Sequence, residues 1–132
     1  MVRERGMKKT STLCVCLAAV LCLTPVLLSA HVKLTRSSPQ ANAALDSSPA
    51  KLQLWFNQEP LLLMSAITLT GPAGAIKLDA PRAGGERSLV VAVGTTLEPG
   101  AYRIAWKTAG DDGHVISGTV DFSVKARTPP AQ

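Results

Sequence analysis

The sequence has few of the residues that form the most recognisable functional sites. Of its 132 residues, 2 are histidine, 3 are cysteine and 4% are aromatic. It contains no Gly-rich phosphate loop, no paired CxxC motif and no HExxH motif, which argues against nucleotide hydrolysis, structural zinc and zinc proteolysis. With 46% hydrophobic residues the chain is too apolar for intrinsic disorder, and its length suits one small domain.

Most of the apparent basicity, and every thiol, belongs to the first 30 residues. The formal net charge is +5, but residues 31–132 carry ten basic and eight acidic side chains, a net of +2. So small a charge argues against a nucleic-acid-binding protein held by phosphate neutralisation. Cys14, Cys16 and Cys22 also lie in the first segment. No disulfide can therefore join the two sheets of a domain formed by the remainder.

Residues 1–30 have the three parts of a secretory signal peptide. A short basic region over residues 1–12 precedes a nearly unbroken apolar run over residues 13–28, and Ser29-Ala30 supplies small residues for cleavage. A membrane anchor is the alternative, because the apolar run is close to the lower limit for spanning a bilayer. The small residues favour cleavage, so we predict a secreted chain that begins at His31.

After residue 30, apolar and polar residues alternate as they do in β-strands. Leu52, Leu54 and Phe56 lie at every second position, and no window of helical length carries a competing period of 3.6 residues. We predict an all-β domain over residues 31–126, an Ig-like Greek-key sandwich or barrel of about seven strands, followed by a flexible tail over 127–132. The expected strands lie near residues 32–35, 51–56, 65–70, 76–78, 89–93, 102–107 and 120–124.

Without disulfides, packing alone must hold this sandwich together. Pro99-Gly100 shortly before Tyr102 resembles the tyrosine corner of Greek-key sandwiches, in which the phenol bonds back to a nearby backbone group. An ordinary turn before a core tyrosine is the alternative. The predicted core consists of Leu54, Phe56, Ile67, Leu69, Val91, Ile104, Trp106, Val120 and Phe122.

The two histidines, His31 and His114, stand where they can share a metal ion. A histidine at the start of the secreted chain offers its α-amine and a ring nitrogen to one ion. In extended chain, residues i and i+2 point the same way, so Asp112 and His114 can face one ion across Gly113. Three nitrogens and one carboxylate oxygen suit Cu(II). Taken alone, each histidine is more simply an ordinary surface or core residue, and the Asp-Gly step a turn.

Four segments resemble the CopC family of copper resistance proteins. The segment from Asp112 to Val124 resembles the family's D-G-H-x-x-x-G-x-x-x-F-x-V ending. Tyr102–Trp106 is similar to its Y-x-V-x-W strand, and His31–Pro39 to its mature N-terminus. Leu54–Pro60 resembles its L-x-F-x-E-P segment, with one extra residue before the proline. The likeness covers nearly all of residues 31–124.

The resemblance implies a periplasmic, seven-stranded, Ig-like protein that binds copper without catalysis, for sequestration or delivery. It implies that His31, Asp112 and His114 hold Cu(II), with Glu59 a weaker candidate. Met64 is the only methionine after residue 30, so the Met-rich loop that gives some members a Cu(I) site is missing, and we expect a member that binds Cu(II) only. It also implies an inner-membrane copper importer of the CopD type as a partner. We expect a monomer.

Two other functions compete with copper binding. A copper-brace oxidase, similar to lytic polysaccharide monooxygenases, also uses an N-terminal histidine, but it needs an exposed aromatic face. A metal-free Ig-like interaction module would bind a partner by adding a strand at an open sheet edge. Zinc is a lesser variant of the metal hypothesis. Resistance, storage and import are not distinguished by the sequence.

Overall fold

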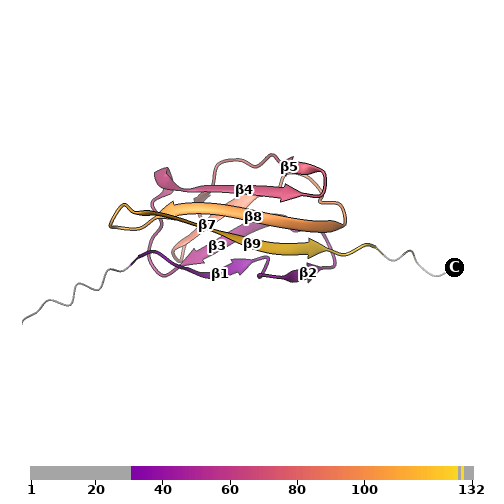
Figure 1. Cartoon of the computed structure of the whole chain (residues 1–132), viewed down its shortest axis with the longest axis horizontal. Helices are drawn as coiled ribbons and strands as arrows, with labels where there is room; N and C mark the ends of the chain where they lie inside the picture. Colours follow the sequence, from indigo (N-terminus) through magenta and orange to yellow (C-terminus); the bar gives the residue numbers. More distant parts are fainter. Residues whose placement is uncertain (1–30, 128, 130–132) are drawn as a thin grey trace, which may run out of the picture.

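The alternating residues form two β-sheets that pack face to face (Figure 1). The computed structural model describes residues 31–127 and residue 129. The predicted signal peptide, and residues 128 and 130–132 of the predicted tail, lie outside the described residues. Within that part of the chain the only helical element is a 3-10 turn, η1 (Leu62–Met64), and no helix has the length and hydrophobicity to cross a bilayer.

The first sheet has four strands in the order β1-β3-β7-β6, and the second has five in the order β2-β9-β8-β4-β5. Neighbouring strands are antiparallel except β2 and β9, which are parallel. The strands are β1 (Leu34–Ser38), β2 (Ala43–Leu45), β3 (Lys51–Phe56), β4 (Ala66–Gly71), β5 (Gly74–Ile76), β6 (Arg82–Ala83), β7 (Ser88–Ala92), β8 (Gly100–Ala109) and β9 (Val115–Val124).

The predicted β-sandwich is confirmed, with two short strands beyond the seven expected. β2 has three residues and β6 has two, so neither is long enough to show an alternating pattern. Two predicted strands are displaced by about two residues: the opening strand begins at Leu34, and β5 ends at Ile76. The short strands β2 and β6 thus lie at the edges of the two sheets, where they pair through their backbones without a recognisable sequence pattern.

The core lies between the two sheets and contains every side chain predicted for it. Each of the nine is at most 7% exposed. Phe56 of β3 meets Trp106 of β8 edge to face, with ring centroids 5.4 Å apart, so this contact joins the sheets. Phe56 is the last residue of β3, and a few residues later the N–H of Leu61 donates to the carbonyl of Ala109 at the end of β8.

The predicted tyrosine corner is also confirmed. The hydroxyl of Tyr102 donates a hydrogen bond to the backbone carbonyl of Glu98, at 2.5 Å. The ring lies against Gly71, where an added Cβ would come within 2.5 Å of the ring edge. The glycine is therefore required by close packing, and the phenol ties the turn before β8 to the start of that strand.

We predict that Gly118→Ala destabilises the fold by about 1–3 kcal/mol, the usual cost of overpacking. Gly118 pairs with Trp106 across the β8–β9 ladder, and a Cβ at Gly118 would lie 2.6 Å from the indole ring. Urea denaturation measures the change. Gly94→Ala is the control, because a Cβ there meets no atom within 4 Å. Equal stability of the two variants would contradict the packing assignment.

Candidate metal centre

The longest hairpin of the fold carries the predicted Asp-x-His motif at its tip. β8 and β9 have ten residues each, and the loop over residues 110–114 joins them at the end of the sandwich where the described chain begins (Figure 1). The backbone N–H of Gly113 donates to the carbonyl of Gly110 at 2.9 Å. Gly113 has a φ of 71°, a left-handed conformation that glycine adopts without strain. This tight turn puts Asp112 and His114 on the same side.

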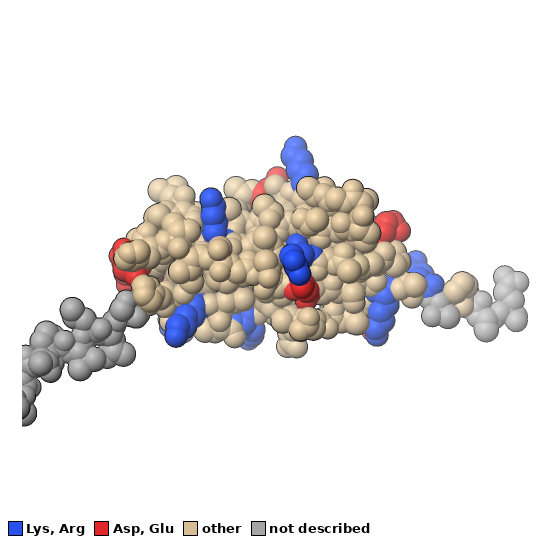
Figure 2. Space-filling view, in the orientation of Figure 1, with Lys and Arg blue, Asp and Glu red and all other residues tan. Residues whose placement is uncertain are grey.

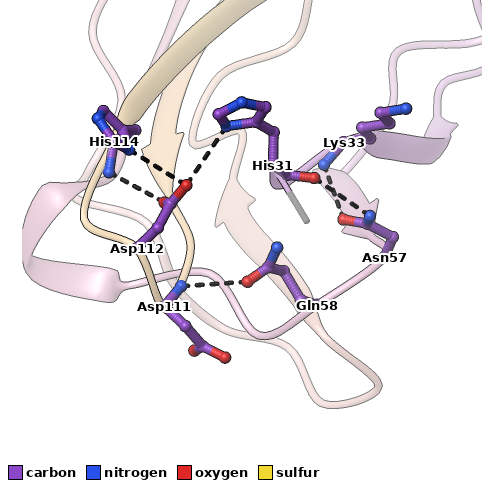
Figure 3. Close-up of polar contacts among 7 residues, drawn as sticks. All are labelled: His31, Lys33, Asn57, Gln58, Asp111, Asp112 and His114. Carbon is purple, nitrogen blue, oxygen red and sulfur yellow. Dashed lines mark hydrogen bonds and ion pairs between the residues drawn. The ribbon is translucent and has the colours of Figure 1, made fainter. Parts of the chain in front are cut away.

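A single carboxylate oxygen meets both histidines. Oδ2 of Asp112 lies 3.3 Å from Nδ1 of His31 and 3.2 Å from Nδ1 of His114 (Figure 3). The imidazole rings are edge to face, with centroids 6.0 Å apart. One potential ligand atom from each residue lies within 4.8 Å of the other two. The structure therefore brings together His31, Asp112 and His114, from segments about eighty positions apart.

Glu59, the weaker candidate, lies outside this group of three potential ligands. Its two preceding neighbours, which the sequence reasoning did not single out, contact the site instead (Figure 3). The side chain of Asn57 donates to the carbonyl of His31 at 3.3 Å and accepts from the N–H of Lys33 at 2.7 Å. The amide oxygen of Gln58 accepts from the N–H of Asp111 at 3.1 Å.

The three potential ligands are open to solvent. The side chains of His31, Asp112 and His114 are 52%, 31% and 74% exposed. An ion from solution can therefore reach their donor atoms without a change in the fold. Structural metal sites are usually closed by their protein ligands. This open arrangement is better suited to a cation that is bound and then released.

Comparison with known proteins identifies the family. A family model described as "CopC domain" matches residues 34–125. The chain belongs to the CopC family. It is 36% identical over 105 residues to Copper resistance protein C of Xanthomonas campestris pv. juglandis, an alignment that covers 73% of this chain and 81% of that protein. The family predicted from the four sequence segments is thereby confirmed.

Two further relatives of this CopC-family chain inform its fold and setting. The crystal structure of PcoC, a methionine-rich copper resistance protein from Escherichia coli, superposes with a TM-score of 0.66 at 30% identity, covering 73% of this chain and all of that one. Copper transport protein CutJ of Bacillus subtilis is 26% identical over 98 residues, which cover 72% of this chain but 18% of CutJ. In CutJ the matched domain is thus one part of a much longer polypeptide.

In this CopC-family chain the central carboxylate is anionic at neutral pH. The N–H of His114 donates to Oδ1 of Asp112 at 3.0 Å, and this hydrogen bond is the main reason that the pKa of the Asp112 carboxyl falls below its ordinary value of 3.8. The side chains of His114 and His31 lower this pKa further, against an opposing effect of desolvation. A lowered folded-state pKa gives stability that is present above the ordinary value and is lost as pH falls through the lowered one.

An apolar turn lies beside the hairpin loop of this CopC-family chain. The apolar turn comprises residues 61–64, and its Leu61 N–H donates to the carbonyl of Ala109 at 2.9 Å, just before the loop. Leu63 is fully exposed, and the other three side chains of the turn are 38–43% exposed. On the face drawn in Figure 2, lysines and arginines are scattered among uncharged residues, so that face presents no continuous basic patch.

We predict that the pKa of Asp112 in the metal-free protein stays below 3.8 when both imidazoles are removed in the double variant His31→Ala/His114→Ala. The backbone N–H of residue 114, which survives the substitution, is the largest cause of the lowering. A pH titration of the Asp112 carboxyl carbon by NMR, with chelator present, measures this. Return of the midpoint to 3.8 would show that the imidazoles, not the turn, set the pKa.

Proposed function

We propose that this chain is a periplasmic Cu(II)-binding protein that sequesters or delivers copper as its cargo. Its relatives in Xanthomonas campestris pv. juglandis and Escherichia coli are named copper resistance proteins. The observation that carries the proposal is the contact of one Asp112 oxygen with imidazole nitrogens of both His31 and His114, at 3.3 and 3.2 Å. Binding through these three residues needs no further conformational change of the sandwich.

The donor atoms fit a cupric ion. Two imidazoles and a carboxylate form a mixed nitrogen and oxygen set, which suits Cu(II), and Cu(II) leads the affinity order of the divalent first-row metals. If the secreted chain begins at His31, its α-amine adds a third nitrogen. The ring nitrogen that can chelate together with that amine is Nδ1, and Nδ1 is the atom that faces Asp112. Zinc, which accepts the same donor types, is the competing metal.

The scarcity of methionine after residue 30 supports Cu(II) rather than Cu(I) as the bound ion. Cu(I) favours soft thioether ligands. Met64 is the one methionine in that part of the sequence, whereas the PcoC relative is described as methionine rich. We therefore propose that this chain binds Cu(II) only.

A binding protein is favoured over a polysaccharide oxidase. Four of the five aromatic residues, Phe56, Tyr102, Trp106 and Phe122, are buried in the core. The fifth, Trp55, is covered by the guanidinium of Arg36 at 3.9 Å from the ring centroid. None of them forms a bare aromatic platform for a sugar chain. The Asp112 carboxylate, 3.3 and 3.2 Å from the two imidazole nitrogens, would also crowd a copper ion held between the histidines.

We propose that the bound ion is handed to a membrane copper-transport protein of the CopD type. CutJ supports this partner, because there a domain like this one is part of a longer polypeptide named for copper transport. The apolar turn supports a docking face at the same end of the sandwich, since exposed apolar side chains favour contact with another protein. We propose that the protein is itself a monomer.

For the copper site, we predict that His114→Ala weakens Cu(II) binding by several orders of magnitude. One extra residue ahead of His31 should do the same, because it removes the terminal amine from the chelate. Competitive titration against a chromogenic chelator gives the affinity, and EPR gives the nitrogen ligands. Because Cu(II) binds imidazole and amine nitrogens only in their deprotonated form, binding should weaken in acidic solution.

Glu59→Ala is the matched control for the copper site, with a smaller expected effect. A loss equal to that of His114→Ala would make Glu59 a ligand. Unchanged binding by His114→Ala would contradict the proposed site. Equal affinity for zinc and copper in the wild-type protein would contradict the proposed metal.

For the partner, we predict that Leu63→Ser leaves the Cu(II) affinity of the purified protein unchanged but lowers copper accumulation in cells that express the protein with its membrane transporter. Loss of a fully exposed leucine affects docking and not folding. Mass spectrometry measures cellular copper. Ala73→Ser, in the turn between β4 and β5, is the control. Wild-type accumulation in the Leu63 variant would exclude the apolar turn from transfer.

A further inference from the structure

We infer that Asn57 and Gln58 are positioning residues that hold the two halves of the metal site at ligand distance before the ion arrives. The two residues are consecutive and directly follow β3. Asn57 bonds to the N-terminal segment, and Gln58 bonds to the hairpin loop (Figure 3). The inference rests on the proposed function and adds how this chain prepares the site.

Asn57 extends the pairing of β1 and β3 as far as His31. The ladder pairs Leu34 with Phe56, and the N–H of Asn57 donates to the carbonyl of Lys33 at 3.0 Å. The Asn57 side chain then accepts from the Lys33 N–H at 2.7 Å and donates to the His31 carbonyl at 3.3 Å. Since Val32 is 1% exposed, core packing holds this segment together with the Asn57 amide. Together they fix the backbone that carries the first imidazole.

Gln58 fixes the other half of the site. Its Oε1 accepts from the N–H of Asp111 at 3.1 Å, directly before the carboxylate residue. The same oxygen lies against Gly110, where a Cβ would come within 2.4 Å of it. The missing side chain at Gly110 leaves room for the Gln58 amide in this position. The loop is therefore seated on the Gln58 amide rather than left to move as a free hairpin tip.

Arg87, just before β7, bonds to Asn57 from the side of β3 that faces away from β1. Its guanidinium donates to the carbonyl of Asn57 at 3.1 Å, and its own carbonyl accepts from the N–H of Phe56 at 3.0 Å. Gly85, Glu86 and Arg87 have φ values of 78°, 49° and 59°. Two successive non-glycine residues in the left-handed region are costly, and such strain persists where surrounding contacts require it. Here both contacts of Arg87 hold the end of β3.

Preorganisation is the physical consequence of these contacts. A site assembled from a mobile chain end and a mobile loop would lose conformational entropy when the ion binds, and its affinity would fall accordingly. Groups that orient metal ligands typically contribute about 10- to 100-fold in affinity. Asn57 and Gln58 are neutral and need not touch the ion. They act through the backbone of His31 and Asp111.

The test uses the mature protein beginning at His31 and Cu(II) alone. We expect Asn57→Ala and Gln58→Ala each to weaken Cu(II) binding by about 10- to 100-fold. At copper saturation their EPR spectra should match the wild type, since the ligands are unchanged, whereas His114→Ala should alter the spectrum. In the metal-free protein, amide exchange of Lys33 should rise in Asn57→Ala, because that N–H loses its acceptor.

Thr35→Val is the matched control. Its hydroxyl bonds to the Trp55 carbonyl at 3.1 Å, so the substitution also removes a side-chain bond between β1 and β3 without touching the site. Urea unfolding of all variants monitors stability. An affinity loss in Thr35→Val equal to that in Asn57→Ala would reduce Asn57 to a structural role and overturn the inference. Wild-type Cu(II) affinity in both Asn57→Ala and Gln58→Ala would also overturn the inference.

The two levels of the proposal fail in different ways. If the wild type does not bind Cu(II), or if His114→Ala binds as tightly, the proposed function is wrong and the inference goes with it. If the wild type binds and His114→Ala does not, but Asn57 and Gln58 can be replaced without effect, only the preorganisation is wrong.

Discussion

The contact of Asp112 with two imidazoles is the interaction that gives this fold its chemistry. The carboxylate is anionic because a backbone N–H in its own turn stabilises the charge. It therefore attracts the ring nitrogen of His114 from the same loop and that of His31 from the start of the described chain, at 3.2 and 3.3 Å. Asn57 and Gln58 hold the same two segments through neutral amide hydrogen bonds, and the shared oxygen adds a charged contact between them.

Core packing sets where these groups can meet. The sandwich has no thiols after residue 30, so its two sheets are held by side chains such as Phe56 and Trp106, which pack edge to face. Phe56 ends β3, and Asn57 and Gln58 come directly after it. Packing of the aromatic pair therefore positions Asn57 and Gln58, which bond to the N-terminal segment and to the hairpin loop. Core packing thus determines where the surface ligands lie, and the site can form before any ion is present.

The sequence predicts the parts of this arrangement that repeat or carry charge. Alternation identified the core residues Leu54 and Phe56. The spacing of Asp112 and His114 indicated that both side chains can face one metal ion. Strand β6, with two residues, has no measurable period. Gln58 escaped notice because a neutral amide has no motif, and its contact with Gly110 joins residues that are distant in sequence. Glu59 became a candidate through the family resemblance, although the neighbouring amides of Asn57 and Gln58 make the contacts to the site.

The exposure of the histidine side chains favours transfer of copper over permanent storage. A structural metal is enclosed by its ligands, whereas here the side chain of His114 is 74% exposed and that of His31 is 52% exposed. An ion held at the surface by preorganised ligands can be bound firmly and still be approached by the ligands of a second protein. Preorganisation supplies affinity without burial, and exposure leaves room for an incoming ligand. The apolar turn is joined to the same loop by the bond from Leu61 to Ala109, so a protein that docks there would meet the ion directly.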